Sequence, residues 1–182
     1  MKKALIILST LTLIFMATGC SKGKTIAVLK TSMGDIEIEL YQKEAPETVK
    51  NFVEHAKAGR YEEVPFHRVI NDFMVQTGDF ENKNGTGGYS YRGEGTSLED
   101  EFGKGLEHVY GSVSMANAGP NTGGSQFFIV DAPNGTDWLD GKHAIFGIVN
   151  DMDIVEKISE VDVNGMDNPL EEVLILSVEI SD

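Results

Sequence analysis

The residues that could do chemistry start with one arginine in an apolar strand. Arg68 lies in the segment 66–80, F-H-R-V-I-N-D-F-M-V-Q-T-G-D-F, which predicts two short strands joined by a polar turn at Asn71-Asp72. Alternate residues of a strand share a face, so Phe66 and Ile70 flank Arg68 on one wall. Such an arginine is either an exposed side chain lying along the strand or a hydrogen-bond donor to a substrate.

The length of this turn decides which residue stands opposite Arg68. A three-residue turn at residues 71–73 pairs Arg68 with Gln76 and Ile70 with Met74, which sets a cation beside an amide. A two-residue turn would place Val75 opposite Arg68 and separate the two polar groups. We expect the three-residue turn.

Two later segments hold further candidates. Residues 113–130 are V-S-M-A-N-A-G-P-N-T-G-G-S-Q-F-F-I-V, and residues 137–147 are D-W-L-D-G-K-H-A-I-F-G. Taken singly, their side chains have ordinary structural roles: Phe128 and Leu139 in the core, Trp138 in packing, and His143 as a structural histidine. The chain has no G-x-S-x-G, H-E-x-x-H or phosphate-binding glycine motif, which indicates no catalytic nucleophile, metal or cofactor.

The elements that must position these residues are mostly short strands. Helices are expected from Pro46 to before Gly59 and at residues 152–158, with His55 on the surface of the first. Residues 81–107 form a long glycine-rich loop, either functional or disordered. Besides the two strands within residues 66–80, strands are expected at residues 25–30, 35–40, 111–116, 126–131, 144–149 and 173–180.

Eight short strands and two helices indicate a mostly antiparallel β fold. Closure into a barrel would remove the exposed sheet edges. Bulky residues expected to face inward favour a filled interior over a ligand-carrying barrel, which is the alternative: Val69, Val75, Ile129 and Ile145.

The first twenty residues predict an export signal. Lys2-Lys3 precedes an apolar run at residues 4–17 that is short for a membrane span. The run ends in A-T-G-C, which resembles the lipobox of bacterial lipoproteins, although Ala17 stands where leucine is more usual. We expect a lipoprotein signal peptide at residues 1–19, a tether at residues 20–24 from a lipidated Cys20, and one domain at residues 25–182. An ordinary secretory signal is the alternative.

Charge and cysteine content limit the partners. The net charge of −14 argues against nucleic acid and against anionic lipid surfaces. Cys20 is the only cysteine, so no disulfide can form within one molecule. A membrane contact would come only from the lipid on Cys20. The expected location is the cell envelope membrane, either the outer face of the plasma membrane or the periplasmic or outer membrane, and the less favoured one is a freely secreted or free periplasmic protein.

Together, the three segments resemble the cyclophilin family of peptidyl-prolyl cis-trans isomerases. The matching blocks are F-H-R-V-I-x-x-F-M-x-Q-x-G-D-F, S-M-A-N-A-G-P-N-T-x-G-S-Q-F-F-I and W-L-D-G-K-H-x-x-F-G, and the resemblance covers about residues 25–180. Asn71-Asp72 departs from a common Pro-Gly, and Gly123 from a frequent asparagine. The resemblance implies a closed eight-stranded antiparallel β-barrel capped by two α-helices, with a site on its outer face.

The resemblance also implies roles for individual residues. The implied catalytic residues are Arg68, Gln76, Asn117 and His143. The implied substrate-binding residues are Phe73, Met74, Ala116, Ala118, Phe128, Trp138 and Leu139.

The activity implied is isomerisation of X-Pro bonds by a monomer that assists the folding of exported proteins. Its partners would be proline-containing peptide segments and cyclosporin-type inhibitors, with no cofactor. The alternative is a cyclophilin-like module that binds proline peptides, or acts as a chaperone, without turnover.

Overall fold

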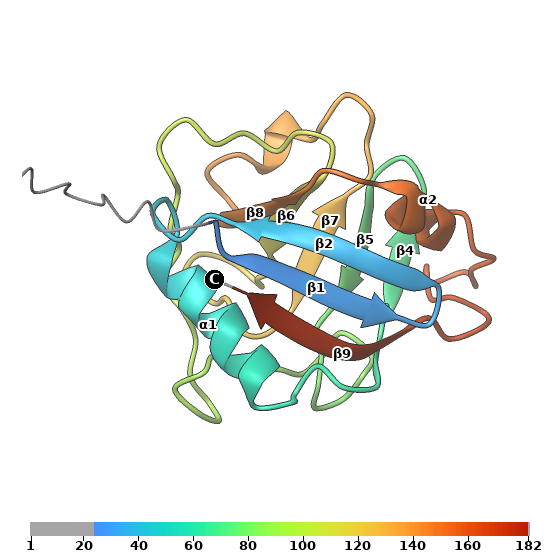
Figure 1. Cartoon of the computed structure of the whole chain (residues 1–182), viewed down its shortest axis with the longest axis horizontal. Coiled ribbons are helices and arrows are strands. Elements are labelled where there is room, and N and C mark those ends of the chain that lie inside the picture. The colour runs from blue at the N-terminus through green and yellow to red at the C-terminus, as the bar shows by residue number, and fades with distance from the viewer. Residues whose placement is uncertain (1–23, 182) are drawn as a thin grey trace, which may run out of the picture.

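A computed structural model describes residues 24–181, which form a curled antiparallel sheet with two helices (Figure 1). The predicted signal peptide and Cys20 lie outside the described residues. The strands are β1 (Ile26–Thr31), β2 (Gly34–Leu40), β3 (Val64–Pro65), β4 (Arg68–Ile70), β5 (Met74–Thr77), β6 (Ser112–Met115), β7 (Phe127–Val130), β8 (Ile145–Val149) and β9 (Leu174–Ser181).

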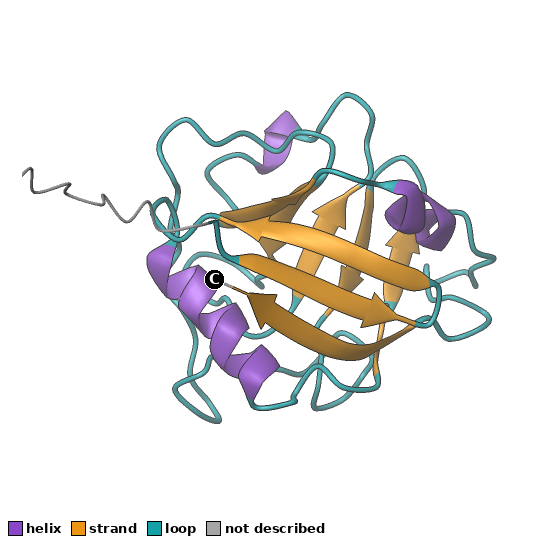
Figure 2. Ribbon diagram, viewed as in Figure 1, coloured by secondary structure: helices purple, strands orange, loops and turns teal. Residues whose placement is uncertain are grey.

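Helices α1 (Pro46–Lys57) and α2 (Asp153–Ser159) agree with the predicted ones, and a short 3₁₀ helix, η1 (Asp137–Leu139), was not predicted. Figure 2 shows β9, β1 and β2 crossing in front of the steeper β7, β5 and β4, so that the sheet wraps around its own interior. This mostly β architecture with two helices confirms the predicted fold class.

The predicted closed barrel of eight strands differs from the structure in the number of strands and in how the sheet closes. One sheet of nine strands runs in the order β3-β9-β1-β2-β8-β6-β7-β5-β4, and its two ends, β3 and β4, are not paired with each other in the described chain. The missed strand, β3, has only two residues, one of them Pro65, which cannot donate to a ladder. Only Phe66 and His67 separate β3 from β4. The two ends of the curled sheet are therefore connected by the covalent chain between β3 and β4, and not by hydrogen bonds between these strands.

Aromatic side chains fill the interior of the curled sheet. The ring of Phe52, on α1, lies 5.4 Å from those of Tyr61 and Phe127 and 5.5 Å from that of Phe146, and all four are buried. These rings occupy the space in which a ligand-carrying barrel would hold its ligand.

The inward-facing residues were predicted with one error. Val69, Val75 and Ile129 belong to the main core, as expected. Ile145 is buried elsewhere, beside His108 and His143, and the next residue of β8, Phe146, joins the core in its place. A shift by one residue along a strand exchanges the two faces of a sheet, which explains this error.

His55, expected on the surface of α1, is buried. Its ring packs against Tyr61, Phe80 and Tyr89, and its Nδ1 lies 3.1 Å from a guanidinium nitrogen of Arg60. Burial, with a smaller contribution from the charge of Arg60, lowers the pKa of His55 to about 4. The helical pattern could not reveal that the segment after β5 folds over this residue.

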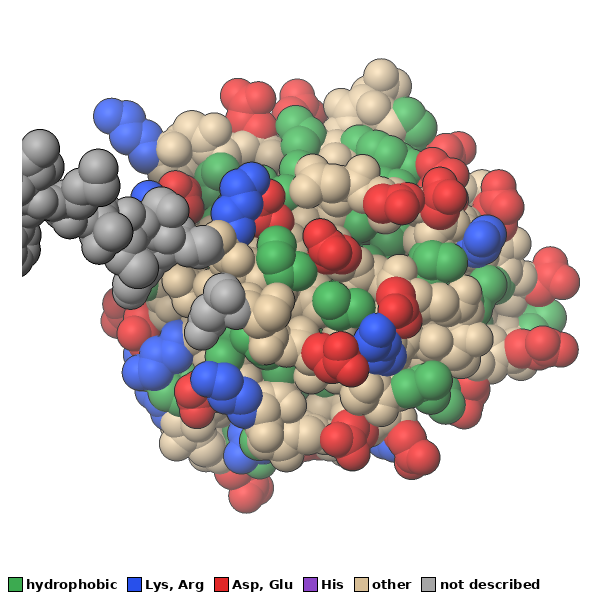
Figure 3. Space-filling view, viewed as in Figure 1, with side chains coloured by type: hydrophobic (Ala, Val, Ile, Leu, Met, Phe, Trp, Pro, Cys, Tyr) green, Lys and Arg blue, Asp and Glu red, His purple; other side chains and the backbone are tan. Residues whose placement is uncertain are grey.

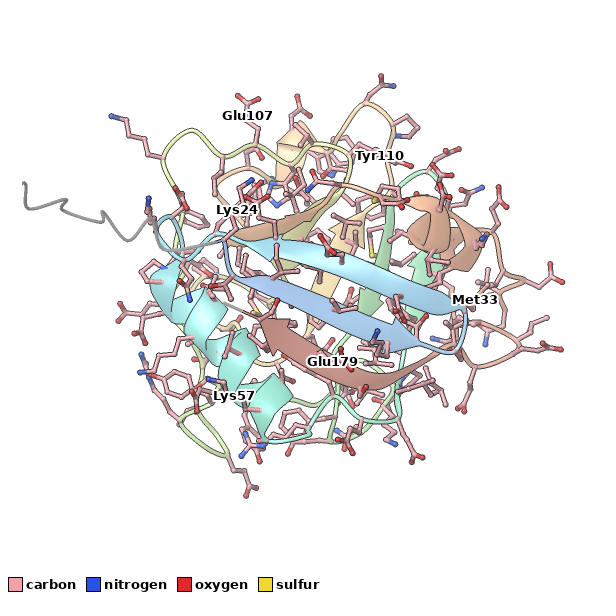
Figure 4. All side chains as sticks on the ribbon, viewed as in Figure 1. Lys24, Met33, Lys57, Glu107, Tyr110 and Glu179 are labelled. Carbon is pink, nitrogen blue, oxygen red and sulfur yellow. The ribbon has the colours of Figure 1, made fainter. Side chains whose placement is uncertain are left out.

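The surface of the described residues is acidic on one face, and Lys24, the first described residue, lies at the edge of that face (Figure 3 and Figure 4). Figure 3 shows Asp and Glu side chains spread over the face formed by β9, β1 and β2. Lys24 lies at the edge of this face, at the other side of the view from β4 (Figure 4), and its Nζ is 2.8 Å from a carboxylate oxygen of Glu39. Among the described helices, none has the length and hydropathy needed to cross a membrane.

Candidate active site

The β4–β5 hairpin has the register that the site requires. Arg68 pairs with Gln76 and Ile70 with Met74, so the turn takes three residues, as predicted. Asp72 in this turn has a φ of 57°, a left-handed conformation that aspartate adopts more readily than most residues. Asn71-Asp72 therefore forms a turn of the length that this register requires, although it lacks a Pro-Gly pair.

A cavity of about 220 Å³ opens on the outer face of this part of the sheet. Its lining comes from β4, β5, β7, η1 and the segments next to β6 and β8. The lining residues are Arg68, Phe73, Met74, Gln76, Ala116, Asn117, Phe128, Leu139 and His143. All the site residues predicted within the domain are among them, except Ala118 and Trp138.

Strand register aligns the polar and apolar parts of the cavity. Arg68 pairs with Gln76, and Gln76 pairs with Phe128, so these three residues form a row across β4, β5 and β7. Phe128 and its neighbour Met74, two residues along β5 from Gln76, are buried in a small apolar cluster separate from the main core. The cavity thus has an apolar floor with a guanidinium and an amide above it.

His143 stands at the edge of the Phe128 ring. The two ring centroids are 5.3 Å apart and the rings are almost perpendicular, at 84°. Nδ1 of His143 lies 3.0 Å from the carbonyl oxygen of Met115. Because a carbonyl only accepts, Nδ1 of His143 carries the hydrogen of this bond.

Asn117 offers a backbone donor at the same cavity. Its side-chain amide is occupied by the carbonyl of Lys142, at 2.8 Å. Within residues 24–181, no hydrogen bond takes up its backbone N–H. That N–H is therefore available to a ligand carbonyl.

Behind Phe128 lies a row of polar groups that sequence reasoning missed. Nδ1 of His108 is 2.6 Å from Asp140, Nε2 is 2.9 Å from the hydroxyl of Ser114, and the ring stacks on Phe128 with centroids 6.2 Å apart. Ser114 is fully buried, so no substrate can reach its hydroxyl. Burial lowers the pKa of His108 more than the bond to Asp140 raises it, which keeps the ring neutral. These groups fix the Phe128 ring from behind.

A second cavity of about 260 Å³ shares Gln76, Ala116 and Asn117 with the first. Ala118 lines it, as predicted for an extension of the groove, together with residues that were not predicted, including Gln126 and residues 85–88. Gln126 accepts a hydrogen bond from Gln76 and donates to the carbonyls of Gly85 and Gly87. Residues 85–88 of the 81–107 loop thus form one wall of the groove.

One buried carboxylate organises that wall. Asp79 accepts hydrogen bonds from the backbone N–H groups of Asn82, Asn84, Gly85 and Gly87, at 2.8 to 3.2 Å. Burial, the largest single effect, raises the pKa of Asp79, but the four donors together lower it below its usual value. The carboxylate stays charged and its role is structural.

Trp138 is placed at the rim and not in the cavity. Its ring centroid is 6.1 Å from that of Phe73, and the residue is 55% exposed. The short helix η1, absent from the predicted elements, holds it there. The two rings extend the apolar surface of the cavity outward.

The arrangement can bind and orient a peptide but has no group for covalent chemistry. It presents a guanidinium, amide donors and an apolar pocket. In the described part of the chain, no group of three or more His, Cys, Asp or Glu side chains could hold a metal ion. Such a site suits a reaction that needs only conformational change in the substrate.

Comparisons with known proteins define the class. Residues 26–180 match the family described as cyclophilin type peptidyl-prolyl cis-trans isomerase/CLD. Peptidyl-prolyl cis-trans isomerase-like 1 of Emericella nidulans is 50% identical over 158 residues, which cover 86% of this chain and 94% of that protein. A putative peptidyl-prolyl cis-trans isomerase of Staphylococcus saprophyticus is 44% identical over 180 residues, covering 84% of this chain and 90% of that protein.

A solved structure agrees with these relatives. A crystal structure of a cyclophilin type isomerase from Cryptosporidium parvum, in the presence of the dipeptide Ala-Pro, has a TM-score of 0.80 at 31% identity. The match covers 86% of this chain and 99% of that one. The chain therefore belongs to the cyclophilin family. Its activity is peptidyl-prolyl cis-trans isomerisation, which confirms the resemblance seen in the sequence blocks and favours an enzyme over a binding module.

Proposed function

We propose that isomerisation takes place in the cavity beside Arg68 and that the guanidinium of this residue is the catalytic donor. Rotation about an X-Pro bond has an activation energy of about 20 kcal/mol because it breaks amide resonance. The cis and trans forms differ by only about 0.5–1 kcal/mol, so the enzyme has only to lower the barrier.

Arg68 can do this by differential binding. In the twisted transition state the proline nitrogen loses conjugation and regains a lone pair. The guanidinium donates a hydrogen bond toward that lone pair, which is less available in either planar ground state. An interaction stronger in the transition state than in the substrate is the kind that accelerates a reaction.

The other lining residues hold the two halves of the peptide. The apolar floor and its rim grip the proline ring, with His143 at the edge of the pocket: Phe73, Met74, Phe128 and Leu139. The amide of Gln76 and the backbone N–H of Asn117 bind the carbonyl oxygens that flank the bond. One half is then fixed while the other rotates. The row of Arg68, Gln76 and Phe128 across the sheet is the observation that carries this assignment.

An isomerase assay on the wild type and Arg68→Ala tests the assignment. Loss of one preorganised donor typically costs about 10²–10³ in rate, so kcat/KM should fall by that factor. Arg68 is exposed, and its replacement should leave the melting temperature almost unchanged. Unchanged kcat/KM in a protease-coupled assay would contradict the mechanism.

The groove also suits the partners expected from the family. We infer that proline-containing segments of unfolded exported proteins are the natural substrates and that cyclosporin-type inhibitors occupy the same groove. The solved relative with Ala-Pro supports binding of proline peptides. Trp138, exposed at the rim, supports contact with a bulky apolar ligand. A single chain supplies the whole lining, so a monomer suffices.

We further propose that the enzyme is a lipoprotein anchored to the cell envelope through Cys20. Support comes from Lys2-Lys3, the apolar run and the A-T-G-C sequence that follows it. Mass spectrometry of the mature N-terminus should find an acylated Cys20 as the first residue, and Cys20→Ser should remain unprocessed. A mature N-terminus without acylation would instead indicate an ordinary secretory signal.

A further inference from the structure

Arg68 lies on the last strand of the sheet, and a loop far away in the sequence covers the free edge of that strand. β4 is hydrogen-bonded to β5 alone, and an uncovered edge strand would expose its unpaired backbone groups. The backbone N–H of Val69 donates to the carbonyl of Asp167, at 2.8 Å. The side-chain amide of Asn168 donates to the carbonyl of His67. The two neighbours of Arg68 in the chain are thus each held by one residue of the loop, Val69 by Asp167 and His67 by Asn168.

The loop also contacts the Arg68 side chain. Nε of Arg68 lies 3.6 Å from Oδ2 of Asp167, which makes an ion pair. The two side chains are 45% and 44% exposed, respectively, so the pair lies at the surface beside the cavity. A guanidinium is planar and carries five N–H donors, so a carboxylate on the Nε side restrains the plane and leaves the terminal nitrogens to other acceptors.

The loop is built to keep Asp167 in this place. Asp167 has a φ of 63°, in the left-handed region, and its N–H donates to the carbonyl of Asn164 at 3.1 Å. Asn164 also accepts from the backbone N–H groups of Met166 and Asn168 through its side chain. Val163 and Pro169 form a bridge that closes the loop. These bonds fix the backbone of Asp167 independently of its carboxylate.

We propose that Asp167 is a positioning residue for Arg68: it orients the guanidinium through Nε so that the terminal nitrogens face the prolyl nitrogen of the substrate. The proposal rests on the catalytic role proposed for Arg68. An ion pair this exposed stabilises a fold little, so the effect of Asp167 belongs to the reaction and not to folding. Small errors in the placement of a catalytic group can cost roughly 100-fold in rate.

Two substitutions separate the carboxylate from the backbone contacts. Asn and Gly both adopt a left-handed φ readily, so both variants keep the backbone of the loop: Asp167→Asn removes the charge, and Asp167→Gly removes the whole side chain. We expect kcat on a tetrapeptide substrate to fall roughly tenfold in both, with KM and the melting temperature nearly unchanged. The Nε–H signal of Arg68 in a nitrogen-15 NMR spectrum should shift in both variants.

The matched control is Glu47→Gln. Glu47 pairs with Arg92 at 2.9 Å, with side chains 45% and 47% exposed, so the charge change and exposure are alike. Kcat should not change in this variant. Full kcat with an unmoved Nε–H signal in both Asp167 variants, or a rise in kcat, overturns the proposal.

A double mutant distinguishes this proposal from that for Arg68. In the Arg68→Ala background, Asp167→Asn should have no further effect, because the residue acts only through the guanidinium. A further loss there overturns the positioning role and leaves the role of Arg68 standing. Unchanged activity in Arg68→Ala alone overturns the proposed function, and with it the reason for positioning.

Discussion

Gln76 is held in the groove by Gln126: its Nε2 donates a hydrogen bond to Oε1 of Gln126, 2.9 Å away. Gln126 in turn donates to the carbonyls of Gly85 at 3.1 Å and Gly87 at 2.7 Å. A side chain outside the predicted site therefore joins a proposed catalytic amide to the loop that forms the opposite wall. The second hydrogen of the Gln76 amide remains available to a substrate carbonyl.

Gln126→Ala should reduce kcat/KM roughly tenfold, since the Gln76 amide would turn freely and lose part of its preorganisation. The effect should be smaller than that of Arg68→Ala, because Gln76 itself is still present. An isomerase assay checks this, with the exposed Gln42→Ala as the matched control. Equal activity of the two variants would show that the groove does not need the link.

Asp140→Ala should loosen the Phe128 ring. Asp140 accepts from both the backbone N–H and Nδ1 of His108, at 2.9 and 2.6 Å. Loss of a charged acceptor for a buried group costs about 1–3 kcal/mol of stability. We expect that loss in urea unfolding, together with a higher KM because His108 no longer supports the floor of the cavity.

Asp137→Ala, at the start of the short helix η1 that Asp140 directly follows, is the control for Asp140→Ala. Asp137 is exposed and interacts there through its backbone carbonyl, which accepts from the N–H of Asp140. Its replacement should change neither stability nor KM. A rise in KM as large as that of Asp140→Ala would mean that η1, and not His108, supports the site.

His55 should make stability depend on pH. Its pKa is lowered from 6.5 to about 4 in the folded state, so between these values the unfolded chain binds a proton that the folded chain does not. Stability is therefore complete above pH 6.5 and falls as the pH decreases toward 4, by up to about 3 kcal/mol. His55→Gln keeps an acceptor for Arg60 without titrating, and its unfolding free energy should lose this part of the slope.

Urea unfolding of both proteins at several pH values measures the difference. His67 and His108 also have lowered pKa values and contribute to the slope of both proteins, so only the difference between them reports His55. Parallel curves over the whole range would show that His55 does not couple folding to pH.

Trp138 should report binding of a cyclosporin-type inhibitor. It is the only tryptophan in the chain, and its ring is 55% exposed at the rim of the cavity beside Phe73. A ligand that covers it removes water from the indole, so the fluorescence should shift to shorter wavelength in a saturable titration. Unchanged emission at saturating inhibitor would count against this binding mode.

Local sequence pattern was enough to predict most of the strands, both α-helices and the register of the hairpin that carries Arg68. Strand alternation, helix spacing and the Asn71-Asp72 turn depend on neighbours within a few residues, and the structure confirms the predicted register of Arg68 with Gln76. The three sequence blocks then identified the family and nine of the residues that line the cavity.

The tertiary structure decided which remote groups support those residues. Gln126, His108 and Asp167 contact Gln76, Phe128 and Arg68, respectively, because the fold brings together segments that are far apart in the sequence. His55 was misplaced and β3 was missed for the same reason, since burial by a distant loop and pairing with the last strand leave no periodic signal. Sequence by itself determined the family and the residues of the proposed site. Only the tertiary fold decided how Arg68 is held, because that depends on contacts between segments far apart in the chain.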